Sequence, residues 1–415
     1  MLSAWIRNFA LFGFFLAVLL NQAFGSKAAA LFLAFAFVAI GWRKHHKMVP
    51  MDAVLLWGLF SVLALVSTFW SLQPEATLRG AFQFTLCNVL VILSANYFSM
   101  RSFYLAAGAA LFVTLSLSIL FPTTGMAPGI GGSLELVNVG LFGSKNQYGL
   151  AAAFALMFGP FITFGREKLF VRLFGLALIA VGLIGISQAV SYGASVVAIV
   201  TLGATIALWV FSKAGVTRPA RFLVFIFGGS TMICFVLVLF GYWDEILSYF
   251  GKDATLTGRT ELWSAGVRAV EENPILGVGF QGFWRVGNPE AEALMAQLGM
   301  STRVVFAFNF HNQIFDVWVQ LGLLGVLLFV LVVVRVLHDM LVIACSKFDA
   351  YYACALSVCI FLLSRCFIES SILSQFNFAH LMFVGATFYL AVRAESELRD
   401  NSERRNMGFW LLRRG

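Results

Sequence analysis

Apolar runs of about twenty residues, long enough to cross a bilayer as one helix, recur along almost the whole 415-residue chain. Charged residues make up 12% of the sequence, whereas a soluble domain carries about a quarter. The short alternating segments of an outer-membrane barrel are absent. We therefore predict an all-α fold, a polytopic membrane bundle.

The runs predict about twelve transmembrane helices. The first run is too long for a signal peptide, and a second follows at once, so we interpret it as a first span. The expected spans are 8–24, 28–42, 53–70, 79–99, 103–121, 146–164, 169–187, 191–211, 221–241, 313–337, 350–372 and 377–393.

The basic residues predict an orientation for this bundle. With the N-terminus in the cytoplasm, most lysines and arginines fall in cytoplasmic segments, as the positive-inside rule requires. The C-terminus is then cytoplasmic too. The net charge of +8 reflects this orientation, and no soluble basic domain is present to bind nucleic acid.

Two outer connections are longer than the rest. The segment 122–145 is rich in Gly and Pro and cannot form a regular helix. The segment 242–312 begins with an amphipathic helix over 258–273, which Pro274 ends. We expect four parts: transmembrane helices over 1–241, a periplasmic loop over 242–312, transmembrane helices over 313–393 and a basic cytoplasmic tail over 394–415.

Metal and dinucleotide sites are not expected. The six cysteines lie in or beside apolar spans without metal-ligand spacing, so we interpret them as small buried hydrophobic residues. Residues 277–282 match GxGxxG formally, but they follow a helix end and precede no βαβ unit. We therefore predict no cofactor and no metal.

The most informative stretch is the end of the long outer loop, at His311 and Asn312. His311 is the one histidine that the expected topology places on the outer side, where a neutral imidazole can take a proton from a hydroxyl group. Asn312 can orient the ring or cap the next span. The alternative for His311 is a structural histidine held by hydrogen bonds.

Several cations point to an anionic substrate. The long loop carries four arginines: Arg259, Arg268, Arg285 and Arg303. Arginine grips phosphate oxygens with paired hydrogen bonds, and a helix N-terminus attracts anions, so Arg259 at the start of the loop helix is the first candidate. The alternative is a solvated arginine paired with a nearby carboxylate.

Other polar residues fall at the outer ends of spans. Arg365 and Glu369 are four apart in an apolar span, where ionisable groups are costly, so they form either a functional pair or a structural ion pair. Arg79, Lys145 and Asn146 begin spans from the outer side. They either line the same substrate-binding cavity or anchor the helices at the headgroups.

These pieces together resemble the O-antigen ligase and Wzy-type polymerase family, most closely the ExoQ-like exopolysaccharide polymerase branch. The resemblance covers the topology and several separated motifs. The motifs are Trp70-Ser71 to Pro74 and Leu78-Arg79, Gly140 to Gly149 around Lys145-Asn146, Gly258-Arg259 to Trp263, Asn273 to Gly279, and His311-Asn312 followed by Gly322 and Gly325.

The resemblance implies a GT-C-like glycosyltransferase of the bacterial inner membrane. It would be metal-independent and inverting, acting on the periplasmic face on a glycan carried by undecaprenyl diphosphate. By this resemblance Arg259 holds the diphosphate and His311 activates the acceptor hydroxyl. Membrane lipid, a flippase, a chain-length regulator and export proteins are the implied partners.

One departure from the family pattern concerns 187–194, where members often carry an arginine and this chain has none. Arg79, Lys145 or Arg365 supplies the missing charge, or the activity differs. We predict polymerisation of lipid-linked repeat units. The rival hypotheses are a ligase that transfers finished glycan to lipid A-core, a transporter or flippase of lipid-linked glycan, and a scaffold that binds the glycan without turning it over.

Overall fold

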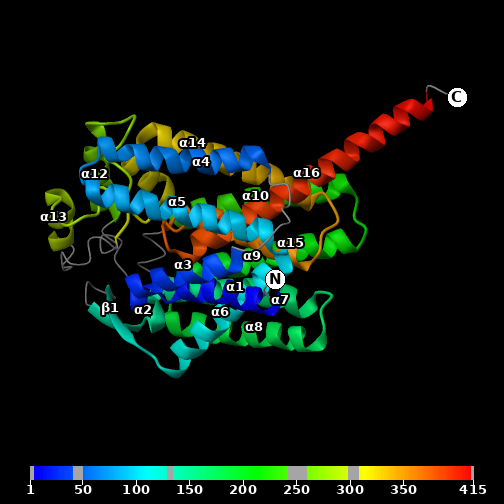
Figure 1. The fold of residues 1–415 in the computed structure, drawn as a ribbon, viewed down its shortest axis with the longest axis horizontal. Coiled ribbons are helices and arrows are strands. Elements are labelled where there is room, and N and C mark those ends of the chain that lie inside the picture. Colours follow the sequence, from blue (N-terminus) through cyan, green and yellow to red (C-terminus); the bar gives the residue numbers. More distant parts are fainter. Residues whose placement is uncertain (1–3, 41–49, 129–133, 242–258, 298–307, 413–415) are drawn as a thin grey trace.

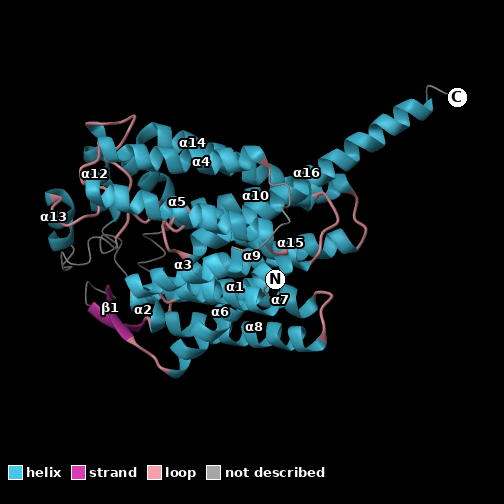
Figure 2. Ribbon diagram, viewed as in Figure 1, coloured by secondary structure: helices cyan, strands magenta, loops and turns pink. Residues whose placement is uncertain are grey.

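Seven helices in the described part of the chain are long and apolar enough to cross a membrane. The computed structural model describes residues 4–40, 50–128, 134–241, 259–297 and 308–412. Three shorter apolar helices accompany these seven. Helices make up most of the described chain, and loops and short strands connect them (Figure 2). The predicted class is confirmed: this is a polytopic helical membrane protein.

The helices of the first half are α1 (Ala4–Leu19), α2 (Asn21–Phe24), α3 (Ser26–Ile40), α4 (Met51–Val66), α5 (Pro74–Tyr97), α6 (Met100–Leu120), α7 (Lys145–Phe164), α8 (Leu169–Ala189) and α9 (Tyr192–Lys213). Those of the second half are α10 (Arg218–Gly241), α12 (Arg259–Glu271), α13 (Pro289–Gln297), α14 (Gln313–Ala344), α15 (Ala350–Arg365) and α16 (Phe378–Leu412). Short 3₁₀ turns, η1 (Ser67–Phe69) and η3 (Gly140–Phe142), follow α4 and precede α7.

Each predicted span overlaps a helix, and the largest differences are at three ends. α14 continues to Ala344, and α16 extends well past the expected end at 393. α15 stops at Arg365, earlier than expected, because the residues after it bind α14: the backbone N–H of Gln313 donates to the Cys366 carbonyl at 2.8 Å. Hydrophobicity alone does not reveal this, since the sequence stays largely apolar there.

The described parts of the long connections gather at one end of the bundle (Figure 1). This end carries α12, α13 and a hairpin of β1 (Thr124–Pro128) and β2 (Leu134–Asn138), paired antiparallel with Thr124 opposite Asn138. α12 matches the predicted loop helix. The hairpin and α13 were not predicted, although Pro289 at the first helical position and the acidic residues after it are helix-start signals.

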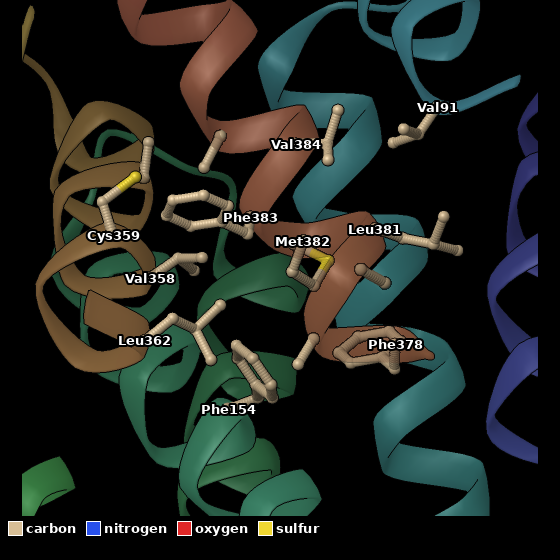
Figure 3. Close-up of a cluster of buried hydrophobic side chains, with 14 of the residues drawn as sticks. Val91, Phe154, Val358, Cys359, Leu362, Phe378, Leu381, Met382, Phe383 and Val384 are labelled. Atoms are coloured by element: carbon tan, nitrogen blue, oxygen red, sulfur yellow. The ribbon is translucent and has the colours of Figure 1, made fainter. Parts of the chain in front are cut away.

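The core lies where α7, α15 and α16 meet (Figure 3). The Phe154 ring of α7 packs 5.3 Å from the Phe378 ring of α16 and 5.8 Å from the Phe361 ring of α15. Leu362 and Met382 fill the same layer and are buried. Helix association in lipid relies on such close packing, so these contacts fix the C-terminal end of α15 against the bundle.

α14 is interrupted by the loop that follows α12. Gly322 has φ 62° and ψ −161°, and the backbone N–H of Leu323 donates to the Pro274 carbonyl at 3.0 Å. Val278 N–H returns a hydrogen bond to the Val319 carbonyl at 2.9 Å. Non-helical backbone at membrane depth is tolerated when such partners satisfy it. The break thus ties the long loop to the helix that begins beside His311.

Candidate active site

His311, Glu369 and Asn146 meet at the loop-bearing end of the bundle. His311 Nδ1 lies 3.2 Å from Glu369 Oε2, and Asn146 Nδ2 donates to Glu369 Oε1 at 3.0 Å. The His311 and Glu369 side chains are 24% and 15% exposed, so they are sheltered but reachable. Three predicted site residues, from three separate segments, are therefore in contact.

The hydrogen bonds define the chemistry of the imidazole. An ionised carboxylate only accepts hydrogen bonds, so His311 Nδ1 donates to Glu369, and in the neutral imidazole Nε2 then carries the lone pair. Within the described ranges, no protein group bonds to Nε2. The arrangement can accept a proton from a hydroxyl group placed at Nε2, with Glu369 stabilising the imidazolium that forms.

The backbone of His311 is held in a left-handed conformation, with φ 52°. Its N–H donates to Asn309 Oδ1 at 2.8 Å, and its ring stands edge-on to Phe308 at 5.5 Å. Asn312 then begins α14 as its cap, because its Oδ1 accepts from the N–H groups of Ile314 and Phe315 at 3.0 and 3.1 Å. Asn312 therefore orients the helix, while Glu369 orients the ring.

Arg365 is buried near this cluster. Its side chain is 3% exposed, its Nε has no hydrogen-bond partner, and it lies over the Phe361 ring at 5.6 Å. Arg365 and Glu369 interact electrostatically, yet they form no ion pair within the described residues, since Glu369 is turned to His311 and Asn146. A buried guanidinium without a carboxylate is costly in lipid, which makes Arg365 a candidate for a functional position.

The stretch 187–194 reaches the same cluster. Ser191 Oγ donates to Asn146 Oδ1 at 3.5 Å, and a Cβ built on Gly193 would lie 3.7 Å from Ile368 Cδ1. Gln188 Oε1 accepts from the Tyr148 hydroxyl at 2.9 Å. The segment that lacks the expected arginine is thus next to the loop that follows Arg365.

Asp316 belongs to the site and was missed from the sequence. It is 1% exposed; its Oδ1 accepts from the Phe310 N–H at 3.4 Å, and it also hydrogen-bonds the Ser370 hydroxyl. It thereby joins the residue before His311 to the residue after Glu369. A carboxylate one turn into an apolar helix is the signal that could have identified it.

The remaining predicted residues are spread around this end. Lys145 is the first residue of α7, next to Asn146. Arg79 is exposed near the start of α5. Arg259 is the first residue of α12, but its side chain and the whole of Arg303 lie outside the described residues. α12 itself is fixed beside the site, because Trp263 Nε1 donates to the Phe310 carbonyl at 2.9 Å.

Backbone strain is concentrated at this end. The described residues other than glycine with positive φ are Val190, Gln281, His311 and Phe376. Val190 precedes Ser191, and Phe376 follows Gln375, which hydrogen-bonds Gln281. Such conformations cost about 1–3 kcal/mol each and cluster at functional sites.

In the described ranges, no three His, Cys, Asp or Glu side chains are grouped as metal ligands.

Fold and site together define a multi-pass membrane protein with a histidine–carboxylate pair at one end of its bundle. A family model described as O-antigen ligase matches residues 174–330. The exopolysaccharide production protein ExoQ of Rhizobium meliloti (strain 1021) is 32% identical over 346 residues, which cover 80% of this chain and 76% of that protein. The chain therefore belongs to the O-antigen ligase family, with ExoQ among its relatives.

Proposed function

We propose that this protein polymerises undecaprenyl-diphosphate-linked oligosaccharide repeat units into an exopolysaccharide at the periplasmic face of the inner membrane, with both termini in the cytoplasm. The observation that carries the proposal is the His311–Glu369 contact at 3.2 Å, at the end of the bundle that bears the long loop. The ExoQ relative, named for exopolysaccharide production, supports this choice of product.

The proposed reaction uses His311 as a general base. Nε2 takes the proton of an acceptor sugar hydroxyl while its oxygen attacks the anomeric carbon of the donor glycan. The bond from that carbon to the lipid diphosphate oxygen breaks, the configuration inverts, and the diphosphate leaves with the bonding electrons. Glu369 stabilises the imidazolium, and a positioned base contributes about 10²–10⁴-fold to a rate.

Negative charge grows on the leaving diphosphate, so nearby cations lower the barrier. We propose Arg365 as the cation that takes the place of the arginine absent from 187–194, because it is buried without an ion pair among the described residues. It also ends α15, and the loop that follows it contacts that segment. Arg259 and Lys145 complete the proposed donor site. Asn146 holds the second oxygen of Glu369.

To test the proposal, we compare the polysaccharide made by cells that carry the intact chain, His311→Ala or Arg259→Ala. The amount of each protein in the membrane is first shown to be equal. Loss of high-mass polymer with accumulation of single lipid-linked units supports the polymerase. Long undecaprenyl-linked chains that do not reach a final acceptor indicate the ligase instead. Normal polymer from both variants contradicts the site and favours transport.

A further inference from the structure

A second polar cluster lies between the long loop, α5 and the segment after α15, and the mechanism above does not use it. Arg285 is its centre. Its Nε donates to the Gln281 carbonyl and its Nη2 to Gln281 Oε1, both at 2.9 Å. The guanidinium is therefore held through one edge, and three of its five N–H groups have no hydrogen-bond partner among the described residues.

Gln281 is itself fixed by several partners. Its N–H donates to Gln320 Oε1 at 2.8 Å, and its side-chain amide forms a reciprocal pair with the amide of Gln375, in which Gln375 Nε2 donates to Gln281 Oε1 at 2.9 Å. Gln281 also has φ 55°, a conformation that costs energy for any residue with a Cβ. The fold keeps Gln281 in this place although glycine would fit it better.

A second arginine approaches Arg285 from α5. A Cβ built on Gly80 would lie 2.9 Å from Gln281 Oε1 and 3.9 Å from Arg285 Nη2, so the loop rests on the helix one residue after Arg79. Burial and the neighbouring charge of Arg79 lower the pKa of the Arg285 guanidinium. Neither arginine has an ion pair with a carboxylate among the described residues.

We propose that Arg79 and Arg285 form an oxyanion-binding subsite, with Gln281 and Gln375 as its supporting residues. Two like charges held together without a carboxylate repel each other, and a phosphate or carboxylate bridging them removes that cost. The subsite rests on the proposed function for its source of ligand: the anion is either the diphosphate of the lipid carrier or an acidic group on the glycan.

Binding to the full chain in nanodiscs of neutral lipid tests this assignment. The two probes are undecaprenyl diphosphate and trigalacturonate. Undecaprenol, which has no charge, is the control for the first probe. We expect wild type to bind at least one anion, and Arg79→Gln with Arg285→Gln together to weaken that binding by at least tenfold. Arg268→Gln is the control, because Arg268 is an exposed loop arginine already paired with Glu290.

Arg79 is exposed, so the single variant Arg79→Gln should fold normally even if the double variant does not. We expect this single variant to weaken anion binding several-fold. The probe that binds more tightly identifies the source of the anion, either the lipid diphosphate or an acidic group on the glycan. Binding that is unchanged in the double variant, no binding of either probe to wild type, or equal competition by phosphatidylglycerol headgroups would overturn the subsite. His311→Ala should abolish polymer but keep anion binding, so failure of the subsite and failure of the polymerase are separable.

Discussion

Glu369 shows how a single carboxylate organises the site, because its two oxygens hold His311 and Asn146. We predict that Glu369→Gln, which keeps the shape and removes the charge, lowers polymer formation by roughly 10²-fold, since the imidazolium loses its counter-charge. Polymer yield per amount of membrane protein measures this. Glu395→Gln, in a partly exposed pair with Arg399 on α16, is the matched control. Full activity of Glu369→Gln would exclude this role.

Glu167 joins the loop after α7 to α6 and α15. It accepts two hydrogen bonds from Arg101 at 2.6 and 2.7 Å and one from the Tyr351 hydroxyl at 2.6 Å. The Arg101 bond holds the pKa of the Glu167 carboxyl below its usual range. We predict that Glu167→Gln costs about 2 kcal/mol of stability at pH 7.

The pH dependence of that cost follows from the direction of the shift. A carboxyl with a lowered pKa stabilises the fold above its unfolded-state value, about 4.3, and this stabilisation is lost as pH falls through the lower folded value. The thermal unfolding midpoints of wild type and Glu167→Gln should therefore converge on acidification. A difference that stays constant down to pH 3 would contradict the ion pair.

The sequence singled out individual candidate residues but did not predict how they pair. His311 stood out as the outer histidine, but it lies 58 positions along the sequence from Glu369. Asn146 lies 223 positions from Glu369. Contacts over such separations depend on helix packing, which hydrophobic runs do not encode. The i, i+4 spacing of Arg365 and Glu369 instead favoured a pairing that the structure does not form.

At the scale of elements, the break in α14 is the feature that positions the long loop. We predict that Gly322→Ala lowers the unfolding midpoint strongly: its φ of 62° alone costs about 1–3 kcal/mol for a residue with a Cβ. A Cβ there would also lie 2.2 Å from the Ile275 carbonyl oxygen. Gly203→Ala on α9, where nothing lies within 4 Å, should leave stability unchanged. Equal midpoints for the two variants would refute the account.

The sequence predicted where the long apolar helices lie because bilayer thickness fixes the length of an apolar run. It did not predict the break, since glycine is common in transmembrane helices and most glycines there cause none. The motif 273–279 could have been the signal. Its Gly277 and Gly279 have φ of 68° and 96° and lie against Gly322 and Ser71.

At the scale of the molecule, the described parts of the two long connections lie at one end of the bundle, and α16 points away at the other (Figure 1). We predict that Val286→Cys is labelled by a membrane-impermeant maleimide in cells with a permeabilised outer membrane, whereas Leu398→Cys is labelled only after lysis. Both side chains are exposed. The described native cysteines are buried or partly buried, which limits background labelling. The reverse pattern would invert the proposed orientation.

The most direct test of the central claim is extension of a defined undecaprenyl-diphosphate-linked repeat unit by the purified chain in lipid vesicles. We predict that wild type forms chains of many units and releases undecaprenyl diphosphate, and that His311→Ala forms none. His338→Ala, a half-exposed histidine at the opposite end of α14, should behave as wild type. Chains of normal length from His311→Ala, or no extension by a wild-type protein that binds the lipid, would contradict the account.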